Sequence, residues 1–529
     1  MRTLLTRLGI YAALAVLVTW PLVTNPGGLV VGGDRTDVWN SLWGLWYAAQ
    51  AGVIPSTTTL LDFPGGGRLA LADPLNALLA LPMIAFLGPV TTYAVLVLGH
   101  LTFSGLAADA LGRACGGQGW IAGIGYQLAP IGIAHLQNGS SEALATGWLP
   151  LAALAIISVV KHGGLLRMVW AACTLILCAI GGWYAGINAW IVLLVVLIFG
   201  VKGHPFKQRL KRLVLPMLIA MAVTLPVASS IKSVALAEDG LVDIKKDDDL
   251  SRIRRTLGSA DPRTFVRPGE FRSPDFSALQ GNPSDYIHTT YLGLSLVFMA
   301  AVATWRRRED SGIWWAAGIS GGILAMGPVV VWNGHPLSLA GNALPMPFLI
   351  LESFPGFSSL SLLWRLASIC ALSLAVLADR LNPKWIVIVL VELMLIAPTK
   401  GLPEVSAVYE YPALQAIPED ADGGLLNLPP TASRSALYEQ VLHQRPMVNS
   451  LNAGTNLAGL KIARAARAVW DREGTWETVV EVAKQQQIAW VVHHKDIMMN
   501  TTHIQASLVF REHAELVAED DRVKVYRIW

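Results

Sequence analysis

Long runs of apolar residues recur along most of this chain and constrain its fold more than any other feature. Several runs continue for 17 or more residues without an acid or a base, and hydrophobic residues make up 53% of the sequence while charged residues make up 15%. A helix of that length approaches the ~30 Å thickness of a bilayer's hydrocarbon core. The sequence therefore predicts an α-helical polytopic membrane protein and excludes a soluble globular core.

We expect about eleven transmembrane helices. The apolar runs assigned to them are 8–24, 92–112, 119–136, 144–160, 166–182, 185–200, 213–231, 288–304, 312–332, 361–379 and 385–402. The run 74–88 has 15 residues, includes Pro82, and would cover roughly 22 Å at 1.5 Å per residue. We therefore predict an interfacial helix there, with Asp73 and Asn76 on its exposed polar edge.

The basic residues predict the orientation of these helices. With a cytoplasmic N-terminus, fifteen Lys and Arg residues fall in cytoplasmic segments and two, Arg35 and Arg68, fall in short external loops. This distribution satisfies the positive-inside rule, and a twelfth span at 74–88 would reverse it. The loop from Lys232 to Tyr286 carries nine basic and ten acidic residues, and we place it outside. No small-x-small cleavage site follows the first apolar run before Trp20-Pro21, so we interpret that run as an uncleaved anchor.

Two domains follow from this topology. Residues 1–402 form a transmembrane domain with external loops 25–91 and 233–287. Residues 403–529 form an extracytoplasmic α/β domain, in which we predict buried strands at 424–428 and 488–493, helices at 459–472 and 475–487, and a closing strand in the tail from Val523.

Several functional classes find no support. The net charge is +3, and the basic residues form short clusters between apolar runs, which argues against nucleic acid as a partner. The four cysteines lie in or beside apolar segments and do not indicate a disulfide framework. The sequence contains no nucleotide-binding glycine-lysine motif, no His-Glu-x-x-His zinc motif and no Gly-x-Ser-x-Gly elbow.

A series of short motifs resembles one membrane family. A short basic N-terminus and one span are followed by Gly33-Asp34, by a run ending in Leu87-Gly88, and by a span ending in Arg113. The further motifs are Gly-Tyr-Gln-Leu-Ala-Pro at 125–130, His-Leu-Gln at 135–137, Trp-Leu-Pro-Leu at 148–151, Tyr-Leu-Gly-Leu at 291–294, Pro-Gly-Phe-Ser-Ser-Leu at 355–360 and His-Gln-Arg-Pro-Met-Val-Asn at 443–449. Together they resemble the polytopic GT-C glycosyltransferases, particularly the uncharacterised bacterial branch related to the YfhO-like membrane proteins.

The resemblance implies an enzyme of the bacterial cytoplasmic membrane that moves a sugar from a polyprenyl-phosphate-linked donor to an extracytoplasmic glycan, lipid or protein acceptor. Such a reaction needs a carboxylate to deprotonate the acceptor hydroxyl and cationic groups to hold the departing lipid phosphate. Asp34 and Asp37 follow the first span and match the family's first-loop acid. Either could be the base, or the pair could bind a divalent cation such as Mg²⁺ or Mn²⁺. Alternatively, Asp34 caps a turn and Asp37 caps the following tryptophan-rich helix.

Four other residues are candidates for substrate binding. His135 and Glu142 lie at the predicted external end of the third span, where a polar turn capping two helices is an equal alternative. Arg365 lies inside an apolar run, where an unpaired charge costs about 2.5 to 3.5 kcal/mol. It could hold the donor phosphate, or it could reach toward the external interface. His288 lies at the mouth of another span.

Two other functions remain open at this stage. One is a membrane transporter of a lipid-linked or small substrate, although the two halves of the chain show no clear repeat. The other is a non-catalytic membrane-anchored binding or assembly protein, in which the external domain does the work and the acids are structural.

Overall fold

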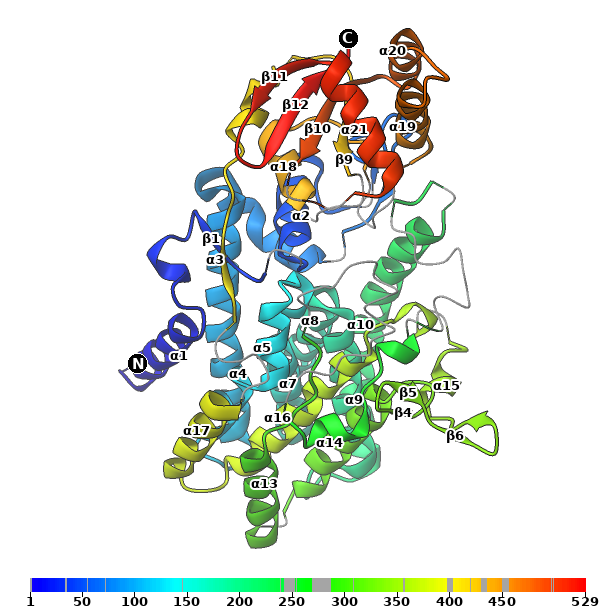
Figure 1. The fold of residues 1–529 in the computed structure, drawn as a ribbon. Helices are drawn as coiled ribbons and strands as arrows, with labels where there is room; N and C mark the ends of the chain where they lie inside the picture. Colours follow the sequence, from blue (N-terminus) through cyan, green and yellow to red (C-terminus); the bar gives the residue numbers. More distant parts are fainter. Residues whose placement is uncertain are drawn as a thin grey trace. The chain divides into compact units, whose positions relative to one another are not determined.

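The chain folds into two compact units in the computed structural model (Figure 1). One consists of Met1–Val38, Ala72–Ser229 and Asp247–Ala407, and the other of Trp39–Leu71, Ser230–Lys246 and Val408–Trp529. We call them the helical unit and the mixed unit. The structure describes residues 2–33, 36–54, 56–71, 73–144, 146–237, 239–241, 253, 255–268, 287–307, 309–354, 357–396, 403–418, 420–429, 435–449, 456–495, 497 and 499–529.

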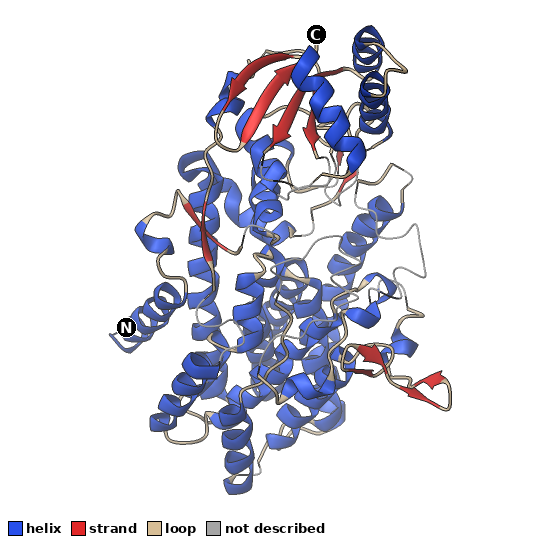
Figure 2. Cartoon of the chain, viewed as in Figure 1, coloured by secondary structure: helices blue, strands red, loops and turns tan. Residues whose placement is uncertain are grey.

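The helical unit is built from apolar helices and a few short strands (Figure 2). Its helices are α1 (Arg2–Val18), α3 (Pro74–Ala114), α4 (Trp120–Gln127), α5 (Pro130–Gln137), α6 (Ser141–Leu144), α7 (Trp148–His162), α8 (Leu165–Gly181), α9 (Trp183–Phe199), α13 (Leu294–Arg306), α14 (Ser311–Ala325), α15 (Phe348–Leu351), α16 (Ser368–Ala378) and α17 (Ile386–Ile396). Helix α10 (Phe206–Leu236) begins in this unit. The 3₁₀ turns are η1 (Leu22–Thr24), η2 (Pro262–Phe265), η3 (Phe357–Ser359), η4 (Leu363–Ala367) and η5 (Pro383–Trp385).

Short antiparallel strand pairs complete the helical unit. Strand β1 (Leu29–Val31) pairs with β8 (Val405–Ala407), so residues just after the first predicted span lie beside residues just after the last one. The other pairs are β4 (Val331–Trp332) with β5 (His335–Pro336), and β6 (Ser338–Leu339) with β7 (Asn342–Ala343).

Within the described residues, two helices are long and apolar enough to cross a membrane, α3 and the segment Phe206–Val234 of α10. Helix α3 has non-helical backbone angles at Gly88 (φ 71°, ψ 170°), which separates the predicted interfacial run from the span that follows. The predicted span 119–136 is divided into α4 and α5, since Pro130 has no N–H to continue the helical hydrogen bonds. The predicted span 312–332 is shorter than expected, because α14 ends at Ala325 before Pro328.

The larger apolar cluster in the core of the helical unit is shared by several helices. Helices α7, α8 and α9 bury residues such as Ile156, Leu175 and Val192, and α14 and α16 add Trp314 and Leu372. These helices bury their apolar stripes against one another, and this packing fixes their positions. It thereby also fixes the positions of the helix ends that carry the polar residues.

The mixed unit contains a four-stranded sheet in the order β11 (Glu515–Glu519), β12 (Val523–Arg527), β10 (Ile488–His494), β9 (Gly424–Leu428). Strands β9 and β10 are parallel, and the other neighbours are antiparallel. Every residue of β9 and β10 is buried, which fits their mostly apolar sequences; the polar exceptions are Asn427, His493 and His494. The other elements are α18 (Ser435–His443), α19 (Leu457–Trp470), α20 (Trp476–Gln485), α21 (Thr501–His513) and η6 (Pro412–Ala416).

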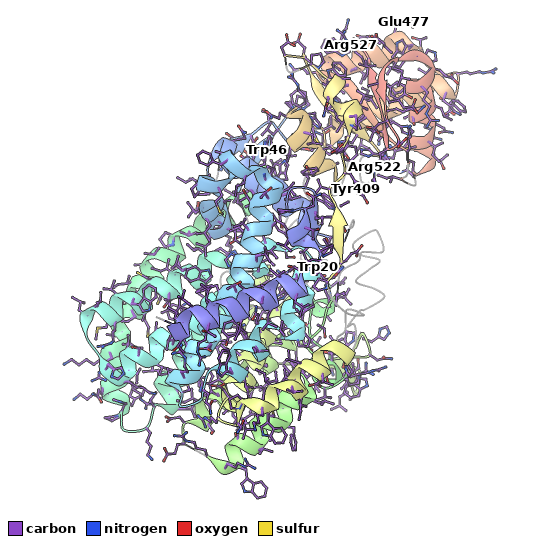
Figure 3. All side chains as sticks on the ribbon, turned by 90° about the vertical axis from the view of Figure 1, so that its left-hand side faces the viewer. Trp20, Trp46, Tyr409, Glu477, Arg522 and Arg527 are labelled. Carbon is purple, nitrogen blue, oxygen red and sulfur yellow. The ribbon has the colours of Figure 1, made fainter. Side chains whose placement is uncertain are left out.

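Segments from early in the chain also belong to the mixed unit. They include helix α2 (Val38–Ala51) from Trp39 onward and the hairpin of β2 (Ser56–Thr58) and β3 (Gly67–Leu69). The tryptophans of α2 are core residues: Trp43 and Trp46 pack in one buried cluster with Met447, and Trp43 Nε1 donates a 2.7 Å hydrogen bond to Gln440 Oε1. On another part of this unit, the Arg522 guanidinium lies 3.1 Å from the centre of the Tyr409 ring (Figure 3).

Candidate functional site

Asp37 lies at the start of the tryptophan-rich helix, in contact with the turn between α5 and α6. It directly precedes Val38, the first residue of α2, so it occupies the N-cap position. Its Oδ2 accepts a 3.2 Å hydrogen bond from Ser140 Oγ, and its backbone N–H donates to the Asn138 carbonyl at 2.9 Å. Gly139 makes this approach possible: it has φ +64°, and a Cβ there would lie 2.5 Å from the Val38 nitrogen.

Asn138 connects this turn to a third segment of the chain. Its side-chain amide donates to the Ile287 carbonyl at 2.8 Å and accepts from the Ile287 N–H at 2.7 Å. This two-way pairing fixes the backbone beside His288. One turn of the chain therefore holds both the first-loop acid and the start of a later predicted span.

Arg365 reaches the same turn from η4. Its Nη1 forms a 2.8 Å ion pair with Glu142 Oε1, and its Nη2 donates to Ser140 Oγ at 3.1 Å. The Arg365 side chain is 4% exposed and that of Glu142 is 27% exposed. The guanidinium also lies 5.6 Å from the centre of the Tyr184 ring. The arginine is therefore enclosed by protein, and it does not extend toward solvent as the snorkelling alternative would require.

The two histidine candidates, His135 and His288, pack against Trp364, the residue that precedes Arg365 in the sequence. The His135 and Trp364 rings are 5.0 Å apart, and the His288 and Trp364 rings are 5.3 Å apart and stacked. All three side chains are buried. Neither ring nitrogen of His135 has a hydrogen-bond partner within the described part of the chain, nor does Arg365 Nε. Buried polar atoms without partners are rare and costly, so these groups are suited to receive a polar ligand.

The structure thus brings Asp37, Glu142 and Arg365 together: Ser140 bonds to both Asp37 and Arg365, and Arg365 pairs with Glu142. His135 and His288 lie beside them around Trp364. We call these residues together with Ser140 the Arg365 cluster. Asp34, the other candidate base, lies outside the described residues. Among the residues that are described, no group of three or more His, Cys, Asp or Glu side chains could hold a metal ion.

A second group of hydrogen-bonded polar residues lies next to Glu142. The sequence did not predict this group as a site. Asp73 caps α3 by accepting from the Asn76 N–H at 3.1 Å and from Asn76 Nδ2 at 2.7 Å. Asn76 Nδ2 also donates to the Ser141 carbonyl at 2.8 Å, and its Oδ1 lies 2.5 Å from His100 Nε2. Asp73 and Asn76 are buried, so the predicted exposed polar edge is wrong: these bonds hold both side chains inside the protein. Burial raises the pKa of Asp73 to about 7, against the lowering effect of the Asn76 N–H, and the charge of Glu142 adds to the rise.

Ser140 and Tyr184 are the members of this site region that sequence reasoning missed. Ser140 stands in an ordinary turn sequence, Asn-Gly-Ser-Ser, and Tyr184 lies in an apolar run. The available signal was proximity in sequence, since Ser140 lies two residues before Glu142. Tyr184 gave no signal, because its ring meets Arg365 only through the tertiary fold.

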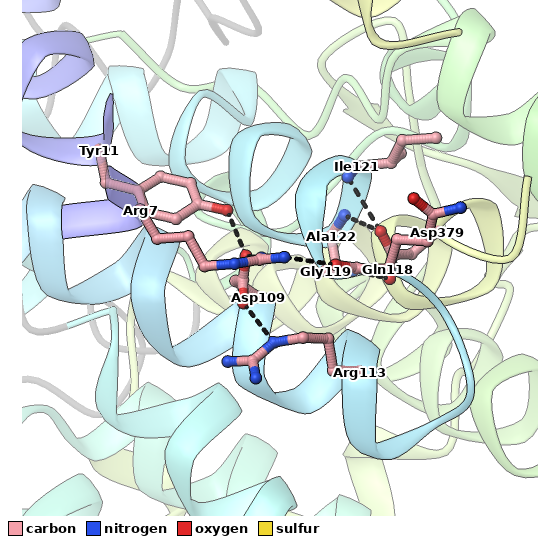
Figure 4. Close-up of polar contacts among 9 residues, drawn as sticks. All are labelled: Arg7, Tyr11, Asp109, Arg113, Gln118, Gly119, Ile121, Ala122 and Asp379. Carbon is pink, nitrogen blue, oxygen red and sulfur yellow. Dashed lines mark hydrogen bonds and ion pairs between the residues drawn. The ribbon is translucent and has the colours of Figure 1, made fainter. Parts of the chain in front are cut away.

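Other buried carboxylates hold the helices together. Asp109 on α3 pairs with Arg7 of α1 and with Arg113, and it accepts from the Tyr11 hydroxyl at 2.8 Å (Figure 4). Asp379 accepts from the backbone N–H groups of Gly119, Ile121 and Ala122 at 2.6, 2.9 and 3.2 Å, at the start of α4 (Figure 4). Such carboxylates satisfy helix N–H groups that have no partner within the helix.

Comparison with solved structures identifies proteins that share the fold of this chain. It matches the arabinofuranosyltransferase AftD from Mycobacteria with a TM-score of 0.56 at 16% identity, covering 98% of this chain and 40% of that chain. It matches the Archaeoglobus fulgidus oligosaccharyltransferase in the apo form with a TM-score of 0.52 at 12% identity, covering 93% of this chain and 69% of that chain. The chain therefore spans about two fifths of the length of AftD. Neither the family models nor the curated proteins gave a match.

The likeness confirms a GT-C-type fold and a helical membrane protein. At these identities it shows the fold and not the reaction. The YfhO-like branch stays a prediction.

Proposed function

We propose that this protein is a membrane glycosyltransferase that moves a sugar from a polyprenyl-phosphate-linked donor to an extracytoplasmic acceptor. The observation that carries the proposal is the Arg365 cluster: Ser140 joins the Asp37 carboxylate to the buried Arg365 guanidinium, which also pairs with Glu142, on a fold found in an arabinofuranosyltransferase and an oligosaccharyltransferase. Both AftD and the archaeal enzyme are named for glycosyl transfer, which supports this class of reaction.

The chemistry assigns a role to each charge. A carboxylate takes the proton from an acceptor hydroxyl as that oxygen bonds to the anomeric carbon, and the bond from this carbon to the phosphate oxygen breaks. The leaving group is the polyprenyl phosphate, whose growing negative charge needs a fixed cation. Arg365 is that cation in our proposal, since a planar guanidinium suits phosphate oxygens and its Nε has no partner among the described residues. Asp34, Asp37 and Glu142 are the candidate bases.

His135 and His288 flank Trp364 and are proposed to contact the sugar or the phosphate. A Mg²⁺ or Mn²⁺ ion between Asp34 and Asp37 is a further proposal, because carboxylate oxygens are the ligands that such ions prefer. The reaction above does not depend on that ion.

The proposed setting is a bacterial cytoplasmic membrane crossed by about eleven helices, with the N-terminus inside. The α/β region after residue 402 is then extracytoplasmic and available to a glycan, lipid or protein acceptor. The distribution of Lys and Arg between the loops supports this orientation.

The test is transfer by the purified full chain in proteoliposomes, supplied with a panel of radiolabelled polyprenyl-phosphate pentoses and hexoses and with membrane acceptor extract. We expect the true base, replaced as Asp→Asn or Glu→Gln, to lose on the order of 10² to 10⁴ in rate. Between the first-loop acids, Asp34→Asn should be the more damaging, since Asp37 directly precedes α2 and has the stronger capping alternative. Glu309→Gln, which breaks an exposed ion pair with Lys202, is the matched control and should keep its rate.

Other outcomes would favour other functions. If variants of Asp34, Asp37 and Glu142 all transfer at the normal rate, these acids are not the base and the proposal fails. If those variants also keep the cellular phenotype while deletion of 403–529 abolishes it, a binding or assembly protein is the better description. Accumulation of substrate inside the vesicles without transfer would favour a transporter.

A further inference from the structure

A separate hollow of about 560 Å³ lies in the helical unit where α9, α10 and α14 meet through their connecting segments. Much of its lining comes from the loops 201–212 and 305–311, which the predicted topology places on the cytoplasmic side. The lining residues on which the argument depends are Phe199, Gly200, Lys202, Arg209 and Gly312. None of these residues takes part in the Arg365 cluster.

Arg209 is the buried cation of this hollow. Its side chain is 7% exposed, its Nη1 donates to the Val196 carbonyl at 3.3 Å, and its Nε has no hydrogen-bond partner within the described part of the chain. Gly200 permits this placement: it has φ +83°, and a Cβ there would lie 1.7 Å from Arg209 Nη1. The fold therefore holds a buried guanidinium against the end of α9 with one N–H unused.

The other groups at this hollow are a second cation, Lys202, and two phenylalanines: Phe199 lines the hollow, and the Phe206 ring lies 5.9 Å from Arg209 Cζ. Lys202 Nζ pairs with Glu309 at 2.6 Å, but both side chains are largely exposed, so this pair is weak and open to exchange. Phe199 and Phe206 stand at the ends of α9 and α10 and are 64% and 51% exposed. Large apolar side chains exposed at the ends of membrane helices lie at the depth of lipid acyl chains, next to the headgroup layer.

We propose that this hollow binds the headgroup of an anionic phospholipid, with the lipid phosphate on Arg209 and Lys202 and the acyl chains along Phe199 and Phe206. Basic pockets between membrane helices on the cytoplasmic side suit such headgroups. Free phosphate shares the same charge chemistry, but it would leave the two phenylalanines uncovered. The proposal does not depend on the glycosyltransferase activity.

The experiment uses the full chain in nanodiscs of phosphatidylcholine with and without phosphatidylglycerol, followed by native mass spectrometry of the lipid retained after release. We expect the wild-type protein to retain phosphatidylglycerol in preference to phosphatidylcholine. Arg209→Gln should weaken this retention roughly fivefold, which corresponds to about 1 kcal/mol per basic residue near an anionic surface. Arg167→Gln is the matched control, because Arg167 also donates to a helix-end carbonyl, that of Gly163 at 3.2 Å, but does not line the hollow.

A second variant keeps the test decisive if Arg209→Gln does not fold. Gly312 lines the hollow and an added Cβ would meet no atom within 4 Å, so Gly312→Leu fills space while leaving Arg209 in place. We expect it to abolish the preference for phosphatidylglycerol. Equal retention by wild type and Gly312→Leu would overturn the site. If inorganic phosphate alone displaces the retained lipid from wild type in detergent, the occupant is a soluble anion and the lipid assignment is wrong.

Discussion

The ion pair between Glu142 and Arg365 predicts that loss of Glu142 lowers the free energy of unfolding more than loss of Arg365 does. Arg365 is 4% exposed, so Glu142→Gln would leave a buried guanidinium with Ser140 Oγ as its remaining side-chain acceptor among the described contacts. Removing one partner of a buried pair costs about 3 to 5 kcal/mol, and the 27% exposure of Glu142 lowers our expectation to about 2 to 3 kcal/mol. Arg365→Met should cost less, about 1 to 2 kcal/mol, because the freed carboxylate can reach water.

The assay is a double-mutant cycle on the free energy of unfolding, measured by titrating the full chain with SDS in mixed micelles and following tryptophan fluorescence. The double variant no longer holds an uncompensated guanidinium, so it should cost about as much as Arg365→Met alone, about 1 to 2 kcal/mol, which gives a coupling energy of about 2 to 3 kcal/mol. The same cycle on the exposed pair of Glu309 and Lys202 should show no resolvable coupling. Additive effects of the two substitutions, or a larger cost for Arg365→Met than for Glu142→Gln, would refute the reasoning that a buried charge is left uncompensated.

Two further predictions concern Asp73 and the orientation of the chain. Burial raises the pKa of Asp73 to about 7 in the folded state, from a value near 4 in the unfolded state. Between these pH values the folded state therefore keeps a proton on Asp73 that the unfolded state has lost. As a result, Asp73 makes the stability of the fold decrease as the pH rises from about 4 to about 7. Asp73→Asn keeps a capping acceptor for the Asn76 N–H and should flatten this part of the profile of melting temperature against pH, whereas parallel profiles would contradict it. A reporter fused after Trp529 should be external and one fused after Arg308 cytoplasmic, and a cytoplasmic reporter at Trp529 would overturn the odd number of spans.

The sequence predicts the class of this fold better than its element boundaries. Apolar runs separate a membrane protein from a soluble one, and the structural likeness confirms a GT-C-type fold. The ends of individual helices depend on local breaks within the runs: Pro130 divides one predicted span and Gly88 interrupts another apolar helix. Apolar composition alone does not register these breaks, because the residues on both sides remain hydrophobic.

The candidate site was partly predictable for a similar reason. Arg365 attracts attention because a charge in an apolar run needs a partner, but the sequence does not name that partner, and Glu142 lies 223 residues away. Asp73 and Asn76 show the opposite case. Their polarity suggested a solvent-facing edge, whereas the fold supplies Ser141 and His100 as buried partners.

The kind of partner that each buried acid has distinguishes structural acids from candidates for chemistry. Asp379 accepts from three backbone N–H groups at the start of α4, and Glu392 accepts from the N–H groups of Leu294 and Ser295 at 2.7 and 2.9 Å. A substrate cannot replace those donors without unwinding a helix end, so these acids are committed to the fold. Glu142 is bound by one Nη of one arginine at 2.8 Å, and a phosphate can compete for that arginine. In the reaction proposed above, donor binding would thereby release the Glu142 carboxylate, which is why we rank Glu142 with the first-loop acids as a candidate base.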